Sequence, residues 1–379
     1  MVLDFRLFSL AVLSATLGSD VLADDRYPPA SFGDLHEGSL NISVFTFRDL
    51  NRNGRYDLSD LPMVGLLVDA TSEGLPEVTR RSNGSGFANF EMSATDLTSD
   101  IPLAGPYTFS VAVPDGWSVT TGNAVQDSRF VMLPGAPADM FADPPPLPVG
   151  LAPDLTISGS VEKGTRSLRT TSPSGETADV AITDGRFSVA ATEGLWTLTF
   201  DGADGTATRA VTVKSEPVVL AETGRAVSTS APNQIVDFEG LVPAEITKVP
   251  SGYHGLNWQN FVAAYWKFYS SEGYRNALMS GAFVAYNGSG QTSIISSETP
   301  FDFVGGYIGL GSLNAEGETL NILAWRGDEL VHQEQLTLSA LGPVYYQADF
   351  DGVTRIQFQT AHYWQAIFDD LEFRVPAAE

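Results

Sequence analysis

The feature that most constrains this chain is the spacing of its turn-forming residues. Short runs rich in Val, Ile, Thr, Phe and Tyr alternate with Gly, Asn, Asp and Pro, so that a turn recurs about every ten residues. Segments with helical periodicity are sparse. Short strands joined at this interval are typical of β-sandwiches. We therefore predict an all-β protein with two Ig-like β-sandwich domains followed by a jelly-roll β-sandwich.

The chain has 379 residues, which is enough for two or three such domains. We predict a signal peptide at 1–23, an Ig-like domain at 24–133, a proline-rich linker at 134–153, a small Ig-like domain at 154–222 and a jelly-roll domain at 234–375. The prolines of the linker favour an extended, semi-rigid spacer. The small domain carries no recognisable chemistry, which favours a spacer role for it as well.

The first residues indicate a secreted protein. An apolar run from Leu7 to Leu17 follows Arg6, and the segment from Val21 to Ala23 fits a small-residue cleavage site. This run is too short to cross ~30 Å of hydrocarbon, so we expect a signal peptide and no membrane anchor. A buried first strand or helix is the alternative. No later segment has the length and apolarity of a transmembrane helix.

The chain contains no cysteine, which excludes disulfides, a lipid-anchoring cysteine and thiolate chemistry. A secreted, multi-domain chain without cysteine fits bacteria better than animals. The net charge is −25, and the acidic residues are scattered rather than gathered in runs. Such a surface repels DNA and RNA. We therefore expect an extracellular or cell-surface protein with no nucleic-acid partner.

The stretch FRDLNRNGRYDLSDLP, from Phe47 to Pro62, has the spacing of a twelve-residue calcium loop. Calcium takes six to eight oxygen ligands, and alternate residues of a tight loop can point their oxygens inward. Gly54 stands at the sixth position, where the chain must turn sharply. The predicted ligands, with Arg55 contributing only its carbonyl oxygen, are Asp49, Asn51, Asn53, Arg55, Asp57 and Asp60.

Two departures from the calcium-loop pattern weaken this site. Asp60 stands where the pattern has Glu, and its shorter side chain reaches less easily for bidentate binding. Three arginines also crowd the carboxylates, so we expect a Kd on the order of 10⁻⁴ to 10⁻³ M. The segments on either side of the loop are strand-like, which excludes an EF-hand pair. They favour a structural ion that holds the loop in one conformation. The alternative is an Asx-rich turn without an ion.

The sequence around this loop, over about 39–123, resembles the B-type repeat of serine–aspartate-repeat surface adhesins. The resemblance rests on 44–54 with 61–68, on the Thr79–Phe90 hairpin, on Gly105–Phe109 and on Pro114–Trp117. It implies an Ig-like β-sandwich whose calcium ions rigidify a surface stalk. Here the domain is single rather than tandem. It also lacks lysine over 24–150, so the Lys–Asn isopeptide bond of some collagen-adhesin-type relatives is impossible in it.

The C-terminal part resembles a jelly-roll domain of uncharacterised secreted bacterial proteins that is similar to galactose-binding-like carbohydrate modules. The segments that carry this resemblance are Asp237–Glu239, Gly252–Trp258, Ser280–Gly288 and Phe368–Phe373. The resemblance implies that first- and last-strand carboxylates bind structural calcium. Glu239 and Asp370 would be those ligands here, and surface carboxylates at strand ends are the alternative.

Aromatic residues concentrate in this C-terminal part. Their flat faces can stack on the apolar faces of pyranose rings, although large aromatics also dominate small β cores. The spacing from Trp258 to Tyr269, after Asn257, fits either a short helix or an aromatic loop, and we favour the loop. The candidate sugar-stacking residues are Tyr253, Trp258, Tyr265 and Trp266, with Tyr363 and Trp364 as further candidates.

Motifs for catalysis are missing from the sequence. There is no His-Glu-x-x-His helix, no Gly-x-Ser-x-Gly elbow and no phosphate-binding glycine loop. Carboxylates are plentiful, so a glycosidase pair stays open, but nothing singles one out. We predict a secreted, non-catalytic binding or adhesive protein that binds a glycan or cell-surface polymer through its jelly roll. The alternatives are a purely structural matrix or envelope component and, third, a polysaccharide-active enzyme.

Overall fold

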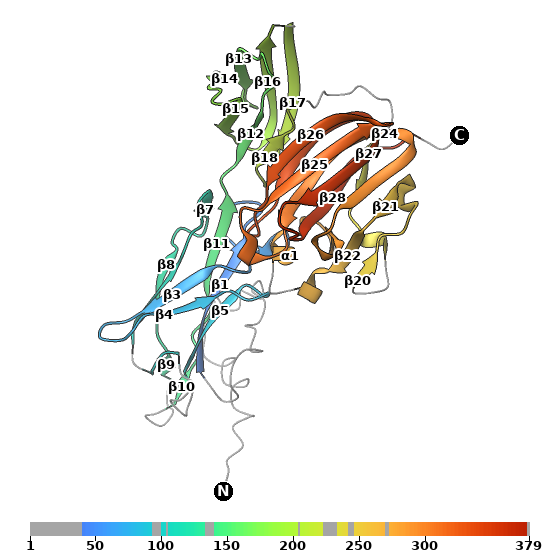
Figure 1. Ribbon diagram of the computed structural model, residues 1–379. Coiled ribbons are helices and arrows are strands. Elements are labelled where there is room, and N and C mark those ends of the chain that lie inside the picture. Colours follow the sequence, from blue (N-terminus) through green and yellow to red (C-terminus); the bar gives the residue numbers. More distant parts are fainter. Residues whose placement is uncertain are drawn as a thin grey trace. The chain divides into compact units, whose positions relative to one another are not determined.

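The structure is a computed structural model that describes residues 40–92, 100–103, 105–132, 140–203, 205–222, 233–241, 246–269 and 273–376. The chain divides into two compact units, Met1–Ala152 and Pro153–Glu379. Strands dominate both units, so the all-β prediction is confirmed (Figure 1). No helix in the described ranges has the length and apolarity that a membrane span needs. The predicted signal peptide lies outside the described residues.

The first unit is a two-sheet sandwich. One sheet has the order β2-β1-β11-β7, with β5 also paired to β1, and the other has the order β4-β3-β6-β8. Phe90 of β5 and Phe109 of β6 join the two sheets, because their ring centroids lie 5.0 Å apart. The strands are β1 Leu40–Arg48, β2 Leu61–Pro62, β3 Leu67–Thr71, β4 Val78–Arg81, β5 Phe87–Met92, β6 Tyr107–Val111, β7 Trp117–Val119, β8 Val125–Ser128, β9 Val131–Met132, β10 Phe141–Ala142 and β11 Leu147–Pro153.

The segment 134–153, predicted to be a proline-rich linker, differs from that prediction in its last part. Residues Leu147–Pro153 form β11, which runs parallel to β1 between β1 and β7. Val149 and Leu151 are buried there, and burial of this short apolar run stabilises a strand rather than an exposed spacer. Pro148 and Pro153 lie near the two ends of the strand, where a missing N–H costs least.

The second unit begins with a small pair of sheets, β15-β12-β18 and β14-β13-β16-β17. Buried side chains such as Ile157, Trp196 and Leu198 fill the space between them. β18 also pairs in parallel with β27, so the first of these sheets continues into the jelly roll. The strands are β12 Thr156–Ser160, β13 Ser167–Thr171, β14 Thr177–Val180, β15 Arg186–Ala190, β16 Gly194–Gly202, β17 Gly205–Val213 and β18 Val218–Leu220.

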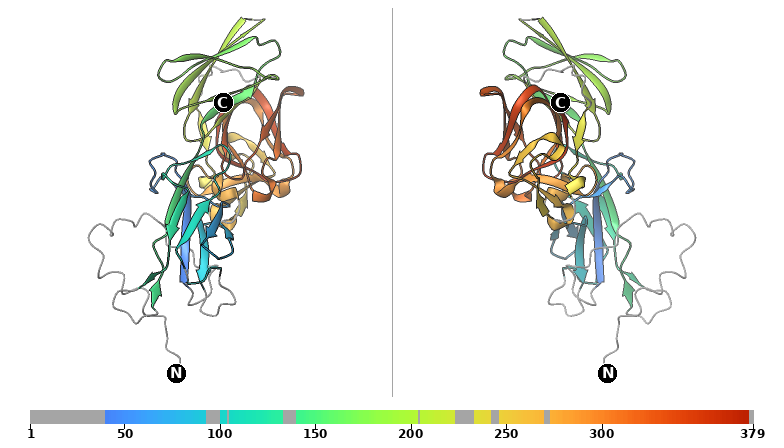
Figure 2. Two further views of the ribbon diagram at one scale, coloured as in Figure 1. Left: turned by 90° about the vertical axis from the view of Figure 1, so that its left-hand side faces the viewer. Right: turned by 90° about the vertical axis from the view of Figure 1, so that its right-hand side faces the viewer.

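The rest of this unit is built around two long strands, β24 and β27, which curve around an aromatic core (Figures 1 and 2). β24 pairs with both β27 and β28, and register shifts between Ser296 and Gly305 mark its bend. The elements are β19 Gln234–Val236, η3 Glu239–Leu241, β20 Ile246–Lys248, η4 Tyr253–Gly255, β21 Asn257–Gln259, β22 Phe261–Tyr265, η5 Trp266–Tyr269, α1 Gly273–Asn276, β23 Phe283–Asn287, η6 Gly288–Gly290, β24 Ser293–Leu310, η7 Leu313–Ala315, β25 Thr319–Arg326, β26 Glu329–Thr337, β27 Val344–Thr360 and β28 Ala366–Arg374.

The aromatic stretch after Asn257 is neither the expected loop nor a helix. It forms β21 and β22 and ends in the short turn η5. Asn260 separates the two strands with a left-handed backbone (φ 59°), and its side-chain amide donates to the carbonyls of Gly288, Gln291 and Thr292. This break between the strands lets Trp258 and Phe261, three residues apart, face the same core. The helical spacing is therefore a consequence of a bend between strands.

Strand register brings several connections to one end of the jelly roll. Ser293 pairs with Phe358, and Leu310 pairs with Ala366, so both ends of β24 lie beside the β27–β28 connection. The 288–292 and 361–365 connections therefore share this end. Loops gathered at one end of a rigid sandwich are where β folds commonly place binding residues.

Candidate functional site

The predicted calcium loop connects β1 to β2. Asp49 is 1% exposed, and its carboxylate accepts from the backbone N–H groups of Asn53 (3.1 Å) and Gly54 (2.7 Å). Gly54 has a φ of +74°, and a side chain there would meet the Thr120 carbonyl at 2.8 Å. The first and sixth positions of the loop thus have the tight turn that the sequence spacing predicts.

Asp60 closes the loop. Its carboxylate is 5% exposed and accepts from the backbone N–H groups of Leu50 and Asp57, both at 2.9 Å. Burial raises the pKa of Asp60 to about 6, and the negative charges of Asp49 and Asp57 act in the same direction. Three carboxylates therefore share a small, partly desolvated loop, and their mutual repulsion favours a cation among them.

The middle of the loop converges on Asp57. Asn51 and Asn53 both donate their side-chain amides to Asp57 Oδ2, at 2.9 and 2.7 Å. Hydrogen bonds from Asn51, Ser59 and Asn53 lower the pKa of Asp57 to about 2. The N–H of Arg55 donates to Asn53 Oδ1 at 2.7 Å. Rotation of either Asn amide by 180° would turn an oxygen toward the same point.

The structure thus gathers all six predicted loop residues, and it satisfies them with the hydrogen bonds of an Asx-rich turn. Over the ranges that the structure describes, no group of three or more His, Cys, Asp or Glu side chains stands in an arrangement that could hold a metal ion. The calcium loop therefore stays a prediction.

The two other predicted metal ligands meet at the 280–283 segment. Glu239 accepts from the N–H groups of Ala282 (2.5 Å) and Phe283 (2.7 Å), and Asp370 accepts from the hydroxyl of Ser280 (2.7 Å). Burial raises the pKa of Asp370. Both carboxylates have protein donors on this segment, and their role as calcium ligands stays a prediction.

Asp369 is a buried carboxylate that the sequence did not single out. It is 0% exposed and accepts from the N–H groups of Met279 and Ser280, at 2.7 and 3.2 Å. Burial raises its pKa well above the usual range, and the neighbouring Asp370 adds to the effect. Nothing in the local pattern distinguishes Asp369 from Asp370, because their difference depends on which face of β28 meets the core.

Trp258 and Tyr253, two of the predicted sugar-stacking residues, pack into the jelly-roll core. Trp258 is 6% exposed, and its indole N–H donates to the Tyr253 carbonyl at 2.8 Å. Its ring packs edge-on against Phe238, Phe261 and Phe373. Tyr253 is partly buried against the same core. In this structure the Trp258 ring has no face open to a ligand.

The other two predicted residues, Tyr265 and Trp266, are half-buried. The guanidinium of Arg275 lies 3.7 Å from the centroid of the Trp266 ring, and Lys267 Nζ lies 5.4 Å from it. These are cation–π contacts. Tyr265 packs beside Phe283, with ring centroids 5.6 Å apart. The cation over Trp266 occupies a face that a sugar ring would need.

Tyr363 and Trp364 are more exposed than the four main candidates. Their side chains are 61% and 42% exposed, and they lie in the 361–365 connection between β27 and β28. This pair therefore presents the aromatic surface that the four main candidates do not.

Several contacts fix the connection that carries this pair. Thr360 donates its hydroxyl to the Trp364 carbonyl at 2.7 Å. Tyr363 has a left-handed backbone (φ 62°), and a side chain at Gly290 would collide with its carbonyl. The buried Glu318 accepts from the N–H of His362 at 3.2 Å and contacts its Nδ1 at 3.1 Å. The backbone that carries the exposed rings of Tyr363 and Trp364 is therefore held in place by these contacts.

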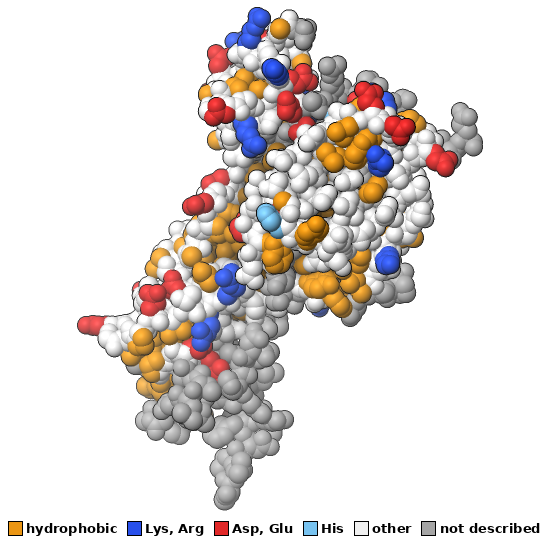
Figure 3. Space-filling view, viewed as in Figure 1, with side chains coloured by type: hydrophobic (Ala, Val, Ile, Leu, Met, Phe, Trp, Pro, Cys, Tyr) orange, Lys and Arg blue, Asp and Glu red, His pale blue; other side chains and the backbone are white. Residues whose placement is uncertain are grey.

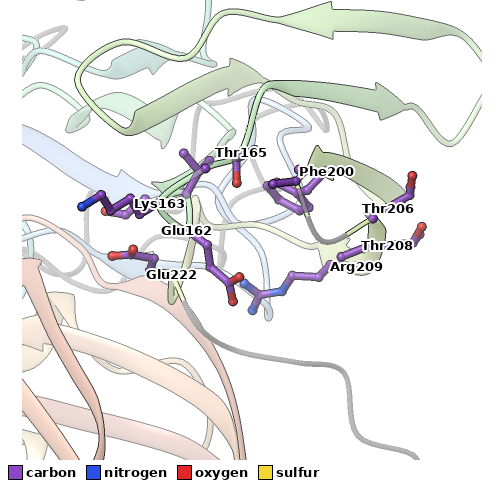
Figure 4. Close-up of a pocket in the computed structure, with 15 residues that line it drawn as sticks. Glu162, Lys163, Thr165, Phe200, Thr206, Thr208, Arg209 and Glu222 are labelled. Carbon is purple, nitrogen blue, oxygen red and sulfur yellow. The ribbon is translucent and has the colours of Figure 1, made fainter.

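Described residues of the second unit line two cavities. One, of about 390 Å³, lies beside β17, with Phe200, Thr206 and Thr208 on one side and Glu162 and Glu222 on the other (Figure 4). The second, of about 370 Å³, lies between β17 and the outer face of β24, β27 and β28.

Acidic side chains are scattered over the face of the molecule seen in Figure 3, without a large basic cluster.

Comparisons with known proteins place the chain in no family. No family model matches the sequence, and no curated protein matches it. The B-type resemblance therefore stays a prediction.

One similar solved structure is that of CBM51-2 with the INT domains of Clostridium perfringens ZmpB, in complex with GlcNAc. It is 11% identical to this chain, with a TM-score of 0.22, and the match covers 49% of this chain and 38% of that chain. The M60 catalytic domain of ZmpB with CBM51-1 and CBM51-2 is 11% identical with a TM-score of 0.20 and covers 89% and 32%. The CBM22-1–CBM22-2 tandem of Paenibacillus barcinonensis Xyn10C is 9% identical with a TM-score of 0.20 and covers 74% and 90%. The chain spans 38% of the first of these proteins. Likenesses this low assign neither a fold nor a function.

Proposed function

We propose that this chain is a secreted, non-catalytic glycan-binding protein of the bacterial cell surface or surroundings. The jelly roll carries the binding surface, and the first Ig-like domain is a spacer that calcium stiffens. The observation that carries the proposal is the exposed pair Tyr363 and Trp364 on a constrained connection.

The chemistry of this pair suits a saccharide. An aromatic ring with an open face stacks on the C–H face of a pyranose, and a fixed backbone avoids the entropy cost of ordering the ring on binding. Trp364 and Tyr363 lie within two residues of His362 and Gln365, whose polar side chains can hydrogen-bond hydroxyl groups. The pair therefore combines stacking surface with adjacent polar groups.

Removing the rings tests the proposal. We expect Tyr363→Ala and Trp364→Ala each to weaken retention by the recognised polysaccharide about tenfold or more, because stacking on an aromatic ring is worth about 1–3 kcal/mol by analogy with base stacking. Affinity gel electrophoresis on a panel of soluble polysaccharides measures this loss.

Leu330→Ala is the matched control. Leu330 is 45% exposed and lies in the β25–β26 hairpin, at the other end of the jelly roll. The polysaccharide should retain the Leu330→Ala variant as strongly as it retains the parent protein. Equal retention of Trp364→Ala, Tyr363→Ala and Leu330→Ala would contradict the proposed surface.

The calcium part of the proposal rests on the donor set of the 49–60 loop. Asp49 and Asp60 are buried carboxylates at the two ends of the loop, and Asn51, Asn53 and Asp57 converge between them. Carboxylate, amide and carbonyl oxygens are the ligands that calcium prefers, so the residues present fit this ion. When bound, calcium would neutralise the crowded carboxylates and join β1 to β2 through the loop.

A further inference from the structure

The second cavity of the C-terminal unit has the lining of a ligand site. We call it the β17 cleft, because Thr212 on strand β17 lines one wall and Tyr307, Tyr345 and Glu372 line the other. Its volume is about 370 Å³, at the small end of the roughly 300–1,000 Å³ typical of small-molecule sites. The opposite wall is the outward face of its sheet, since Tyr346 and Phe350 on the alternate positions of β27 face the core.

Two tyrosine rings form the apolar part of the cleft. Tyr307 and Tyr345 pack edge to face, with ring centroids 5.2 Å apart. A hydrogen bond joins the Tyr345 hydroxyl to Glu372, and burial with the charge of Glu372 raises the Tyr345 pKa above its usual range. The hydroxyl therefore stays protonated at neutral pH and orients the Glu372 carboxylate.

Planar polar groups are held in place around these rings. Asn233 donates to Glu372 at 3.1 Å and accepts from Arg374 Nε at 2.8 Å. On the other side, Gln347 donates to Asp349 at 2.7 Å. These partners keep the carboxylate, amide and guanidinium groups of the wall in fixed orientations, as a binding site for a polar ligand requires.

The charges of the cleft nearly cancel. Glu216, Asp349 and Glu372 contribute three carboxylates, and Lys214 and Arg374 contribute two cations, while Arg209 forms a 2.9 Å ion pair with Asp349. A strongly charged ligand of either sign would face like charges, whereas a neutral ligand with many hydroxyl groups could donate to the carboxylates and accept from the cations. The half-buried Tyr345 ring, backed by the buried Tyr307 ring, would cover part of its C–H surface.

We propose that the β17 cleft is a second binding site, one that takes a neutral mono- or disaccharide. It is independent of the Tyr363–Trp364 surface. Glu372 and Ala366 are six residues apart on β28, which corresponds to about 20 Å along the strand. Failure of either site can therefore be measured without the other.

A substitution that fills the cleft tests this site. Thr212 is an exposed residue of β17 that lines the cleft, and Thr212→Trp would fill it without changing the core. Thr208→Trp is the matched control, because Thr208 lies on the same face of β17 and lines the other cavity. The readout is saturation-transfer NMR of the full chain with millimolar glucose, galactose, mannose, xylose, N-acetylglucosamine and their β-linked disaccharides.

We expect at least one of these sugars to bind the parent protein, Thr208→Trp and the double variant Tyr363→Ala, Trp364→Ala. Thr212→Trp should weaken that binding about tenfold or more. If Thr212→Trp does not fold, Glu372→Gln replaces it, with a similar loss expected because one carboxylate oxygen becomes a donor. Binding by none of the sugars, or binding that survives filling of the cleft, would overturn the β17 site. Loss in the Tyr363, Trp364 variant alone would overturn it while supporting the function proposed above.

Discussion

Trp258→Ala is expected to lower the free energy of unfolding of the C-terminal unit by about 3–5 kcal/mol, the usual cost of truncating a buried Trp. The ring contacts Phe238, Phe261 and Phe373, so its removal leaves a cavity in the aromatic core. The Tyr253 carbonyl also loses its donor, the indole N–H at 2.8 Å. Urea unfolding followed by circular dichroism measures the loss.

Trp364→Ala is the control for this prediction, since it removes the same side chain from an exposed position. Its stability should change by no more than about 0.5 kcal/mol, because no core cavity forms. Trp258→Phe should lie between the two, since it keeps most of the packing and loses the hydrogen bond. Equal stability of Trp258→Ala and Trp364→Ala would contradict the assignment of Trp258 to the core.

Calcium is expected to stabilise the first Ig-like domain, and Asp49→Ala is expected to abolish this effect. For a Kd of about 10⁻⁴ to 10⁻³ M, 10 mM calcium adds about 1.4–2.7 kcal/mol. Asp49→Ala should also cost about 2–4 kcal/mol without calcium, because the N–H groups of Asn53 and Gly54 lose their acceptor. Thermal unfolding with and without chelator measures both effects, and hydrogen exchange over 47–62 localises them.

Asp57→Ala separates the ion from the fold. Asp57 is half-buried whereas Asp49 is 1% exposed, so its loss should affect calcium-free stability less than the loss of Asp49. The Asp57→Ala variant should nevertheless lose most of the calcium-dependent stabilisation, because it lacks one of the three carboxylates of the loop. Thermal unfolding of the parent protein that calcium does not shift would contradict the calcium loop and leave an Asx-rich turn.

Local patterns in the sequence were sufficient for the strands and for the calcium-type loop. The spacing of Asp49, Gly54 and Asp60 predicts a tight turn, and the structure has it, because the backbone N–H groups that donate to the two aspartates belong to the loop itself. Alternation of β-branched and aromatic residues likewise predicts strands such as β1 and β25. Such features depend on neighbours in the chain, and a single sequence shows those neighbours.

Features that depend on distant partners could not be predicted. Trp258 and Trp364 are the same residue type in aromatic segments, yet one is buried by Phe373 and the other lies exposed on the β27–β28 connection. The apolar run of β11 could pass for a linker until β1 supplies its partner. The β17 cleft depends on distant partners as well, since Thr212 and Glu372 are 160 positions apart in the sequence.

The most direct test of the glycan-binding proposal is a glycan array probed with the full chain in calcium and in chelator. We predict binding to a defined set of glycans that is the same in both conditions, because the proposed ion stiffens the first Ig-like domain and the Tyr363–Trp364 surface belongs to the jelly roll. The double variant Tyr363→Ala, Trp364→Ala should lose most of that signal. A folded protein that binds no glycan on the array in either condition would contradict the account.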